Sequence, residues 1–578
     1  MSRRTWVTVL AAMATTTVLL TACGGAGGNQ LQAPDQDNVG HNAMNPHPAS
    51  DIKDGGTLQW PLDTPVDNWN RYQVDGTTLD EQRMQNTLFP WLFTENPDTS
   101  VKLNPDYLTS ATMLSTDPEV IEYKLNPKAK WSNGRPISWQ DFRAQWQALN
   151  GTNPAYQVSD TAGYENIAAV ERGTDDQDVK VTYATKFGEW RGVFSPLYPM
   201  ELNSSPEEFN TGWVTQPKIT SGPFTFGAID QTAKTVRVDR DPAWWGTKPH
   251  LDSILFKVVA PDALPDALAS GTIDWADANG SAAAVNRVKG ARNPALRQAI
   301  AQLRGIPNVV LRQAVAPDTT HLTANGGPGR ILGDQRVRLA VFRAIDRQAI
   351  TEAVIGKVVP DPEPLGNHFF PQGSKDYADH SDQLAFDKSQ ADQELDAVGW
   401  TRQGQYRVKN RKELDLTYVC SDTSVARPAA ELVQQQLGEV GIKVTVNTVP
   451  ATDYLKKYLS TGDFDLTSFR WFSNTYQLSG TEPQYELDLA NPADVRQNYG
   501  HVGGQEINDL YHTALAELDD HKRTELTQQL DQALWKIGGE LPLYQTPGAI
   551  AVRNTVANWG AVGFAYNPID YVDIGFLK

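Results

Sequence analysis

Two clusters of polar and aromatic residues in the C-terminal half of the chain carry side chains that bind polar ligands. Ser421 and Asp422 form the first cluster, and the run Trp471-Phe472-Ser473-Asn474 forms the second. Hydroxyl, carboxylate and amide groups supply hydrogen bonds to a ligand, and an indole ring supplies a surface on which it stacks. The expected chemistry is recognition of a bound molecule. The alternative for Ser421 and Asp422 is a simple turn after a strand, where both residue types are common.

The elements around these clusters read as a βαβ unit. Apolar alternation predicts strands over 414–420 and 442–446, and the helical spacing between them predicts a helix that Gly441 ends. A helix over Thr452–Ser460 and a strand over Phe464–Trp471 extend the unit. Both clusters therefore follow the carboxyl ends of strands, which is where ligands bind in open α/β sheets. Cys420, at the end of the first strand, is expected to be a small buried hydrophobe.

The sequence carries none of the common signatures of catalysis or metal binding. G-x-S-x-G, G-x-x-x-x-G-K, H-E-x-x-H and C-x-x-C are all missing, and the nine histidines lack ligand spacing. We therefore expect no enzyme, no catalytic residues, no metal and no cofactor.

The N-terminal segment has the features of an export signal. Arg3 and Arg4 precede an uncharged apolar run that ends at Leu20-Thr21-Ala22-Cys23. The segment resembles the bacterial lipoprotein signal, which implies a signal peptide over 1–22, acylation of Cys23 (palmitate among the usual chains) and stable attachment through more than one acyl chain. An ordinary signal peptide with a chance cysteine is the alternative. Arg3-Arg4 leave both the general and the twin-arginine export routes open.

Composition narrows the classes of partner. The chain has 69 acidic and 51 basic residues and a net charge of −18, which argues against nucleic acid or an anionic membrane surface as partner. Only two cysteines are present, so no disulfide framework is expected and stability must come from a large core. No second apolar run is long enough to span a bilayer, and the lipid is the only membrane attachment expected.

Local signals place several further elements. Residues 23–54 are poor in large apolar side chains and predict a flexible tether, and the folded part begins at Gly55-Gly56. Ser138 and Asp141 form an approximate capping box at the start of a helix. Asp334 and Asp346 are expected to cap two successive helices, the second ending at Gly356. Two more apolar stripes predict helices over 507–518 and 526–537.

With these segments placed, the chain resembles the family 5 extracellular solute-binding proteins of ABC importers, the oligopeptide- and dipeptide-binding group. The resemblance lies in the strand, turn and helix start over 123–142, and in five later landmarks. These landmarks are Ser221-Gly-Pro-Phe224, Asp241-Pro-Ala-Trp-Trp245, Ala269-Ser-Gly-Thr-Ile-Asp274, Arg336-Val-Arg338 with Ala344-Ile-Asp-Arg347, and Val398-Gly-Trp400.

The resemblance implies an α/β, two-lobed fold of the type II periplasmic-binding-protein kind, with a hinge and an extra subdomain. Lobe I would combine 55–85, 218–320 and 552–578, the extra subdomain would be 86–217, and lobe II would be 321–551. Closure of the lobes over a ligand would be driven by contacts made only in the closed state.

The resemblance also identifies candidate ligand contacts. Family members that bind peptides present an Asp, shortly after a Trp, to the ligand's ammonium group; Asn474 is the matching position here, so recognition of a free N-terminus is open. Trp471 and Tyr476 either stack on the ligand or fill the interface between lobes. Trp60 and Trp69 would face the cleft from the other lobe, with core packing as the stronger alternative.

The resulting functional hypothesis is a monomeric lipoprotein on the outer face of the bacterial cytoplasmic membrane. It would capture a peptide or another polar solute and deliver it to ABC permease subunits. The alternative is a regulator or scaffold of the envelope that reuses the same fold and transports nothing.

Overall fold

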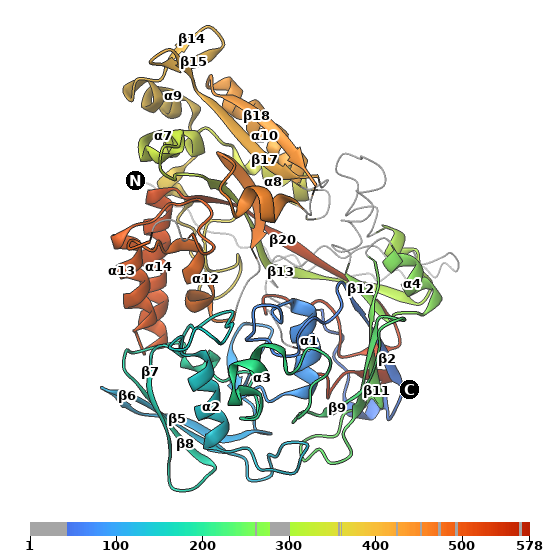
Figure 1. Cartoon of the computed structure of the whole chain (residues 1–578). Coiled ribbons are helices and arrows are strands. Elements are labelled where there is room, and N and C mark those ends of the chain that lie inside the picture. Colours follow the sequence, from blue (N-terminus) through green and yellow to red (C-terminus); the bar gives the residue numbers. More distant parts are fainter. Residues whose placement is uncertain are drawn as a thin grey trace, which may run out of the picture.

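The computed structural model of this chain shows two lobes and a subdomain (Figure 1). It describes residues 43–260, 263–277, 301–356, 359, 361–422, 426–450, 453–471, 475–491, 495–565 and 569–578. Lobe I lies at the lower right of the view, the subdomain at the lower left and lobe II at the top. Each body has its own cluster of buried apolar side chains.

Lobe I is built on a four-stranded sheet in the order β2-β11-β10-β9. Its strands are β2 (Thr57–Leu62), β11 (Ser253–Val258), β10 (Thr235–Arg240) and β9 (Phe224–Asp230). β2 runs parallel to β11, and the other pairs are antiparallel. Helix α1 (Leu79–Leu88) begins at a capping box between Thr78 and Glu81 and buries Met84 and Leu88 in the lobe I core. Helix α4 (Leu264–Ser270) ends at the left-handed Gly271.

The segment before lobe I corrects one expectation. Ala43 forms a bridge with Ala561, and β1 (Ile52–Lys53) pairs with β22 (Gly575–Leu577), which also pairs with β21 (Val556–Ala557). The predicted tether is therefore wrong for residues 43–54. The composition of this segment is that of a free linker, but its pairing partners lie at the other end of the chain. Local composition carries no information about contacts so distant in sequence. Residues 23–42 lie outside the described part.

The subdomain contains an antiparallel sheet in the order β5-β6-β8-β7. Its strands are β5 (Leu108–Thr116), β6 (Glu119–Leu125), β8 (Asp178–Tyr183) and β7 (Ile167–Arg172). Helix α2 (Trp139–Leu149) packs on this sheet and starts at the predicted Ser138–Asp141 capping box, which is confirmed. The short β3 (Phe93–Glu95), β4 (Val101–Leu103) and α3 (Pro206–Thr211) complete the subdomain region.

Lobe II confirms the predicted βαβ unit. β17 (Asp415–Ser421) and β18 (Lys443–Val449) pair in parallel, joined by α10 (Ala426–Glu439). α7 (Gln335–Arg343) and α8 (Arg347–Ile355) are capped by Asp334 and Asp346, as predicted. The helix expected over 452–460 is a π-helical segment, Tyr454–Leu459. Cys420 is free and fully buried, which confirms its expected role as a core residue.

The remaining elements of lobe II lie in two places, at its outer end and next to the subdomain. α9 (Lys388–Ala397) and a small sheet of β14 (Thr401–Gln403), β15 (Tyr406–Lys409) and β16 (Lys412–Glu413) lie at its outer end (Figure 1). α12 (Gln477–Tyr485), α13 (Gln505–Leu515) and α14 (Asp520–Ile537) extend down to the subdomain, and their apolar faces join its core. Lobe II therefore contacts the subdomain directly.

Two long strands connect the lobes. β13 (Val309–Ala324) and β20 (Glu540–Arg553) pair in the sheet β12-β20-β13-β19-β17-β18, whose other members include β12 (Trp275–Asp277) and β19 (Leu466–Trp471). The register of β13 against β20 shifts between Val315 and Thr319. β12 joins β20 on the lobe I side of this shift and β19 joins β13 on the lobe II side.

The hydrophobic clusters cross the predicted division of the chain in two places. Phe369 and the apolar faces of α12, α13 and α14, from the segment predicted as lobe II, belong to the subdomain cluster. Tyr198, Leu202 and Trp213, from the segment predicted as subdomain, belong to the lobe I cluster. The boundaries themselves stay a prediction.

Candidate functional site

A cleft of about 1030 Å³ opens where lobe I, the subdomain and lobe II meet. Lobe I supplies residues 71–77, one face of α1 and residues 569–573. The subdomain supplies parts of 93–107, 159–164 and 187–195, and lobe II supplies parts of 475–480 and Gln497. The volume is at the upper end of the range of about 300–1,000 Å³ found for small-molecule pockets. The cleft is therefore large enough for an extended ligand.

The charges on the cleft wall are mostly negative. Among its described lining residues are two cations, Arg71 and Lys102, and six carboxylates: Glu95, Asp106, Asp160, Glu189, Asp570 and Asp573. Burial and the neighbouring Asp570 raise the pKa of Asp106, and burial and Asp573 raise the pKa of Asp570. The excess of carboxylates gives the cleft a negative potential, which favours positively charged parts of a ligand.

Residues 67–76, which form the lobe I edge of the cleft, are held by buried amides. Asn68 Nδ2 donates to Asn210 O at 2.9 Å, and Asn70 Nδ2 donates to Phe209 O at 3.0 Å. At Gly76 a Cβ atom would lie 2.1 Å from Asn70 O, so only glycine fits there. These bonds and close contacts fix the backbone that presents Arg71 and Tyr72 to the cleft.

The lobe II edge of the cleft is the N-terminus of α12. Glu189 of the subdomain accepts hydrogen bonds there from Leu478 N at 3.1 Å, Ser479 N at 2.9 Å and Ser479 Oγ at 2.6 Å. The carboxylate thus caps a helix of another body, where exposed N–H groups and the helix dipole favour negative charge. Burial raises the pKa of Glu189, although the hydrogen bonds from Ser479 and Leu478 act to lower it. Tyr476 lies against Gly192, where a Cβ atom would be 2.7 Å from its ring.

Trp471 belongs to a buried polar network of lobe II. Its Nε1 lies 3.2 and 3.1 Å from the two carboxylate oxygens of Glu540, and its ring stacks on Tyr499 with centroids 6.1 Å apart. His321 Nδ1, at 2.8 Å, also contacts that carboxylate. Burial opposes the charge of Glu540, but the hydrogen bond with His321 is foremost among the contacts that lower its pKa. Burial lowers the pKa of His321.

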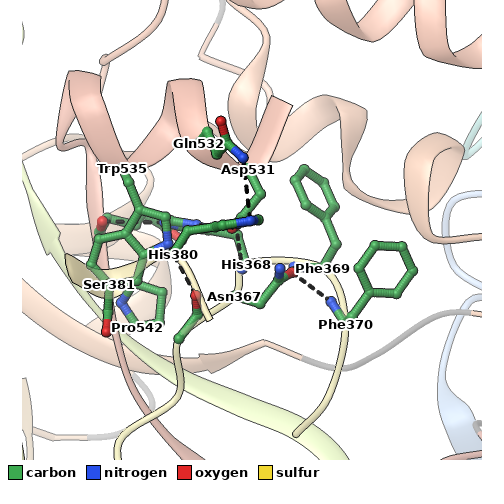
Figure 2. Close-up of polar contacts among 12 residues, drawn as sticks. Asn367, His368, Phe369, Phe370, His380, Ser381, Asp531, Gln532, Trp535 and Pro542 are labelled. Atoms are coloured by element: carbon green, nitrogen blue, oxygen red, sulfur yellow. Dashed lines mark hydrogen bonds and ion pairs between the residues drawn. The ribbon is translucent and has the colours of Figure 1, made fainter. Parts of the chain in front are cut away.

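A second carboxylate, Asp531 of α14, lies between two histidines (Figure 2). His368 Nδ1 is 2.7 Å from Asp531 Oδ1, and His380 Nδ1 is 2.5 Å from Asp531 Oδ2. The hydrogen bond to Asp531 raises the pKa of His380. Burial opposes ionisation of Asp531, but the hydrogen bonds from His368 and His380 lower its pKa. The pair fixes the irregular segment 367–380 on α14.

The structure brings only part of the predicted site to the cleft. Tyr476 lines it, whereas Trp471 is half-buried in the Glu540 network and is not among its lining residues. Ser421 is the last residue of β17 and Asp422 follows it, with Asp422 N–H donating to Val449 O at 2.7 Å, and both residues lie outside the lining. Asn474 lies outside the described residues.

Trp60 and Trp69 are core residues of lobe I. Trp60 is 0% exposed and packs with Trp275, Trp559 and Tyr571, and Trp69 is 1% exposed against Phe226. The expectation that they face the cleft is wrong for this conformation, and the core alternative holds. The alternation of β2 turns Trp60 to the inner face of the sheet.

Several cleft residues carry no signal in the sequence. Arg71, Trp91, Asp106 and Glu189 come from four separate loops or strand ends, and only the fold brings them together. Trp69 was predicted from the right loop, but the residue of that loop that reaches the cleft is Arg71. Within the described residues, no group of histidine, cysteine or acidic side chains has the arrangement of a metal site. None of the described helices is both long and apolar enough to cross a bilayer.

Comparison with known proteins places the chain clearly. The model of the bacterial extracellular solute-binding proteins, family 5, matches residues 102–481. Oligopeptide-binding protein OppA of Mycobacterium tuberculosis is 34% identical over 583 residues, covering 100% of this chain and 94% of OppA.

Two solved structures share the fold. The periplasmic EDTA-binding protein EppA has a TM-score of 0.80 at 22% identity, covering 94% of this chain and 99% of EppA. The oligopeptide-binding protein AppA of Bacillus subtilis, in complex with a nonapeptide, has a TM-score of 0.70 at 19% identity, covering 91% and 100%.

Replacing Glu189 with Gln tests the contact between the subdomain and α12. The amide loses the charge that favours three donors, so we expect a loss of about 1–3 kcal/mol in the free energy of unfolding. Hydrogen exchange should become faster over residues 475–485. The exposed Glu171→Gln on β7 is the control and should leave both readouts unchanged. Unchanged exchange in Glu189→Gln would show that the carboxylate does not hold the helix.

The pair His380–Asp531 predicts a pH dependence of stability. The folded state raises the pKa of His380, so the protonated ring stabilises the fold. This stabilisation is fully present below the pKa of histidine in the unfolded chain, about 6.5, and is lost as pH rises through the pKa in the folded state. The difference in Tm between the wild type and His380→Gln should therefore be largest at acidic pH and shrink on the alkaline side.

The exposed His521, on the same helix α14, provides the control for this series. His521→Gln should follow the wild type at every pH. A Tm difference for His380→Gln that is constant from mildly acidic to mildly alkaline pH would contradict the assignment.

Proposed function

This chain belongs to the bacterial extracellular solute-binding proteins of family 5, and we propose that it captures peptide-like ligands outside the cell and delivers them to an ABC importer. The observation that carries the proposal is the cleft of about 1030 Å³ between the lobes and the subdomain. Peptides combine polar backbone groups with apolar side chains, and this cleft offers both kinds of surface, with Trp91, Tyr107 and Trp244 beside its charged residues.

The ligand class rests on similarity over the whole chain. OppA of M. tuberculosis, which is similar from end to end, is named as an oligopeptide-binding protein. EppA, which shares the fold, is described as binding EDTA. Fold alone therefore does not select a ligand, and the whole-chain relative is the better guide. The family is one of solute-binding proteins, and we propose that this member likewise breaks no bond.

We propose that the protein works at the outer face of the cytoplasmic membrane, held only by a lipid on Cys23 after removal of residues 1–22. Its other partners would be ABC permease subunits, and it would act as a monomer without a cofactor. The sequence Leu20-Thr21-Ala22-Cys23 supports the anchor. A ligand receptor near a membrane transporter benefits from such a tether, because the anchor raises its concentration there.

The alternative, an envelope regulator or scaffold, would have no need of an open cleft. A cleft filled by side chains of the protein itself would favour the scaffold hypothesis. The described side chains leave about 1030 Å³ unfilled instead, which supports capture. Recognition of a free N-terminus stays a question for Asn474, where an amide replaces the family's carboxylate.

Ligand capture can be tested with protein purified from its host. We expect native mass spectrometry to show bound peptides that are released on unfolding. Adding the same peptides to stripped protein should raise its Tm, because a ligand that binds only the folded state stabilises it. Stripped protein that gains no stability from its co-purified molecules, or an empty cleft in protein taken from the host, would favour the scaffold alternative.

The anchor can be tested with Cys23→Ser in the full chain. The wild type should partition into the detergent phase and incorporate labelled palmitate, since stable attachment needs the acyl chains. The variant should lose the label and move to the aqueous phase. Cys420→Ser is the matched control, because that thiol is buried in lobe II. Equal labelling of the wild type and Cys23→Ser would exclude acylation of this cysteine.

A further inference from the structure

Arg71 is a charged residue of the cleft for which the described part of the fold supplies no counter-ion. Its guanidinium lies 5.5 Å from the centroid of the Trp91 ring, and both residues line the cleft. In the described residues, no carboxylate forms an ion pair with Arg71, and its side chain makes no hydrogen bond there. A guanidinium has five N–H donors, and here all of them remain available to a ligand.

The backbone that presents Arg71 is fixed on both sides. Arg71 N donates to Tyr198 OH at 3.1 Å, Asn70 Nδ2 donates to Phe209 O at 3.0 Å, and Tyr72 OH donates to Pro196 O at 2.9 Å. Asn70 is 0% exposed, so this support is part of the lobe I core. The fold therefore fixes the backbone of Arg71, and the contact with the Trp91 ring orients its guanidinium.

The polar groups around Arg71 do not neutralise it. Burial raises the pKa of Tyr72, Tyr164 and Tyr198, so these phenols are neutral at physiological pH. The indole N–H of Trp91 and the hydroxyl of Ser195, also on this wall, are buried without a hydrogen-bond partner among the described residues. The amide oxygen of Asn86 is a buried acceptor of the same lining, also without a partner among the described residues. The unused donors near Arg71 and its charge would be satisfied by an acceptor with negative charge.

Lys102, the other cation of the described lining, is placed differently. It lies near Asp570, where its charge opposes the increase in pKa that burial and Asp573 cause, and Asp106 is also close enough to Asp570 for their charges to interact. An anion there would meet several carboxylates, whereas an anion at Arg71 would meet none that pairs with this guanidinium. Asp160 and Glu189 also line the cleft, and Ser159, next to Asp160, donates to Tyr72 O, but neither carboxylate forms an ion pair with Arg71 in the described residues.

We infer that Arg71, stacked on Trp91, binds a carboxylate of the ligand and thereby sets which way the ligand lies in the cleft. This inference rests on the proposed function and adds the chemical group recognised. The carboxylate is either the C-terminus of a peptide or an acidic side chain, and both present the same two oxygens to the fork of the guanidinium.

The test uses three mixed-length libraries of short peptides made from uncharged residues. The first has free C-terminal carboxylates, the second is C-terminally amidated, and the third is amidated with one Glu in each peptide. Affinities are measured by fluorescence titration of the full chain. The wild type should bind the free-acid library about 10- to 100-fold more tightly than the amidated one, the range for a charged hydrogen-bonded pair. If the third library binds as tightly as the free-acid library, an acidic side chain is sufficient to supply the carboxylate.

Two variants and a control locate the effect. Arg71→Met keeps an unbranched side chain without charge and should bind the free-acid library as weakly as the wild type binds the amidated one. Arg71→Lys keeps the charge but loses the planar fork and should be intermediate. Arg143→Met is the control, because that guanidinium also lies over a tryptophan, Trp139 at 5.6 Å, but outside the cleft. It should match the wild type.

Each remaining outcome decides the question. A full preference for carboxylates retained in Arg71→Met, in protein with unchanged Tm, overturns the assignment. A wild type that binds all three libraries equally also overturns it, while peptide capture stands. A wild type that binds none of them refutes peptide capture together with the role of Arg71. Should Arg71→Met fold poorly, Arg71→Lys decides, because wild-type discrimination in that variant would exclude a bidentate contact.

Discussion

The pairing of β13 with β20 is the constraint on which the two-lobed arrangement depends. These strands run through both lobes, so lobe I and lobe II extend the same sheet from its two ends. The register of this pairing shifts twice, between Val315 and Thr319 and between Thr320 and His321, so the ladder of hydrogen bonds that joins the lobes is interrupted between them. Immediately beyond the second shift, the carboxylate of Glu540 joins His321 on β13 to Trp471 on β19. This carboxylate therefore ties the two long strands to β19 at the lobe II end of the pairing.

The sequence predicted those parts of the fold whose signals are local. The βαβ unit over 415–449, the capping residues Asp334 and Asp346 and the Ser138–Asp141 box were all readable because each depends on residues within one or two elements. The π-helical Tyr454–Leu459 was expected as an ordinary helix. In a segment of only one or two turns, the spacing of apolar residues does not distinguish an α-helix from a π-helix. The family resemblance then supplied the order of lobes that local patterns lack.

The candidate site was less predictable, because its residues are distant in sequence. Strand ends pointed to Ser421, Asp422 and the region of Asn474, but the described cleft is lined chiefly from lobe I and the subdomain. Trp60 and Trp69 are aromatic in the right region, yet the sheet turns one inward and the lobe I core takes the other. Arg71 has no signal of its own; its importance appears only in the fold, where none of the described carboxylates forms an ion pair with it.

The pairing of β1 with β22 has a mechanical consequence. The first described residues of the chain end on lobe I, bound to its last strand, so a pull on the N-terminal side of Ala43 is borne by lobe I. A receptor held from that side has lobe I as its stationary half and lobe II as the half that swings. The face of lobe II would then travel furthest when a ligand arrives, and a transporter that senses loading would gain most by reading the position of that lobe.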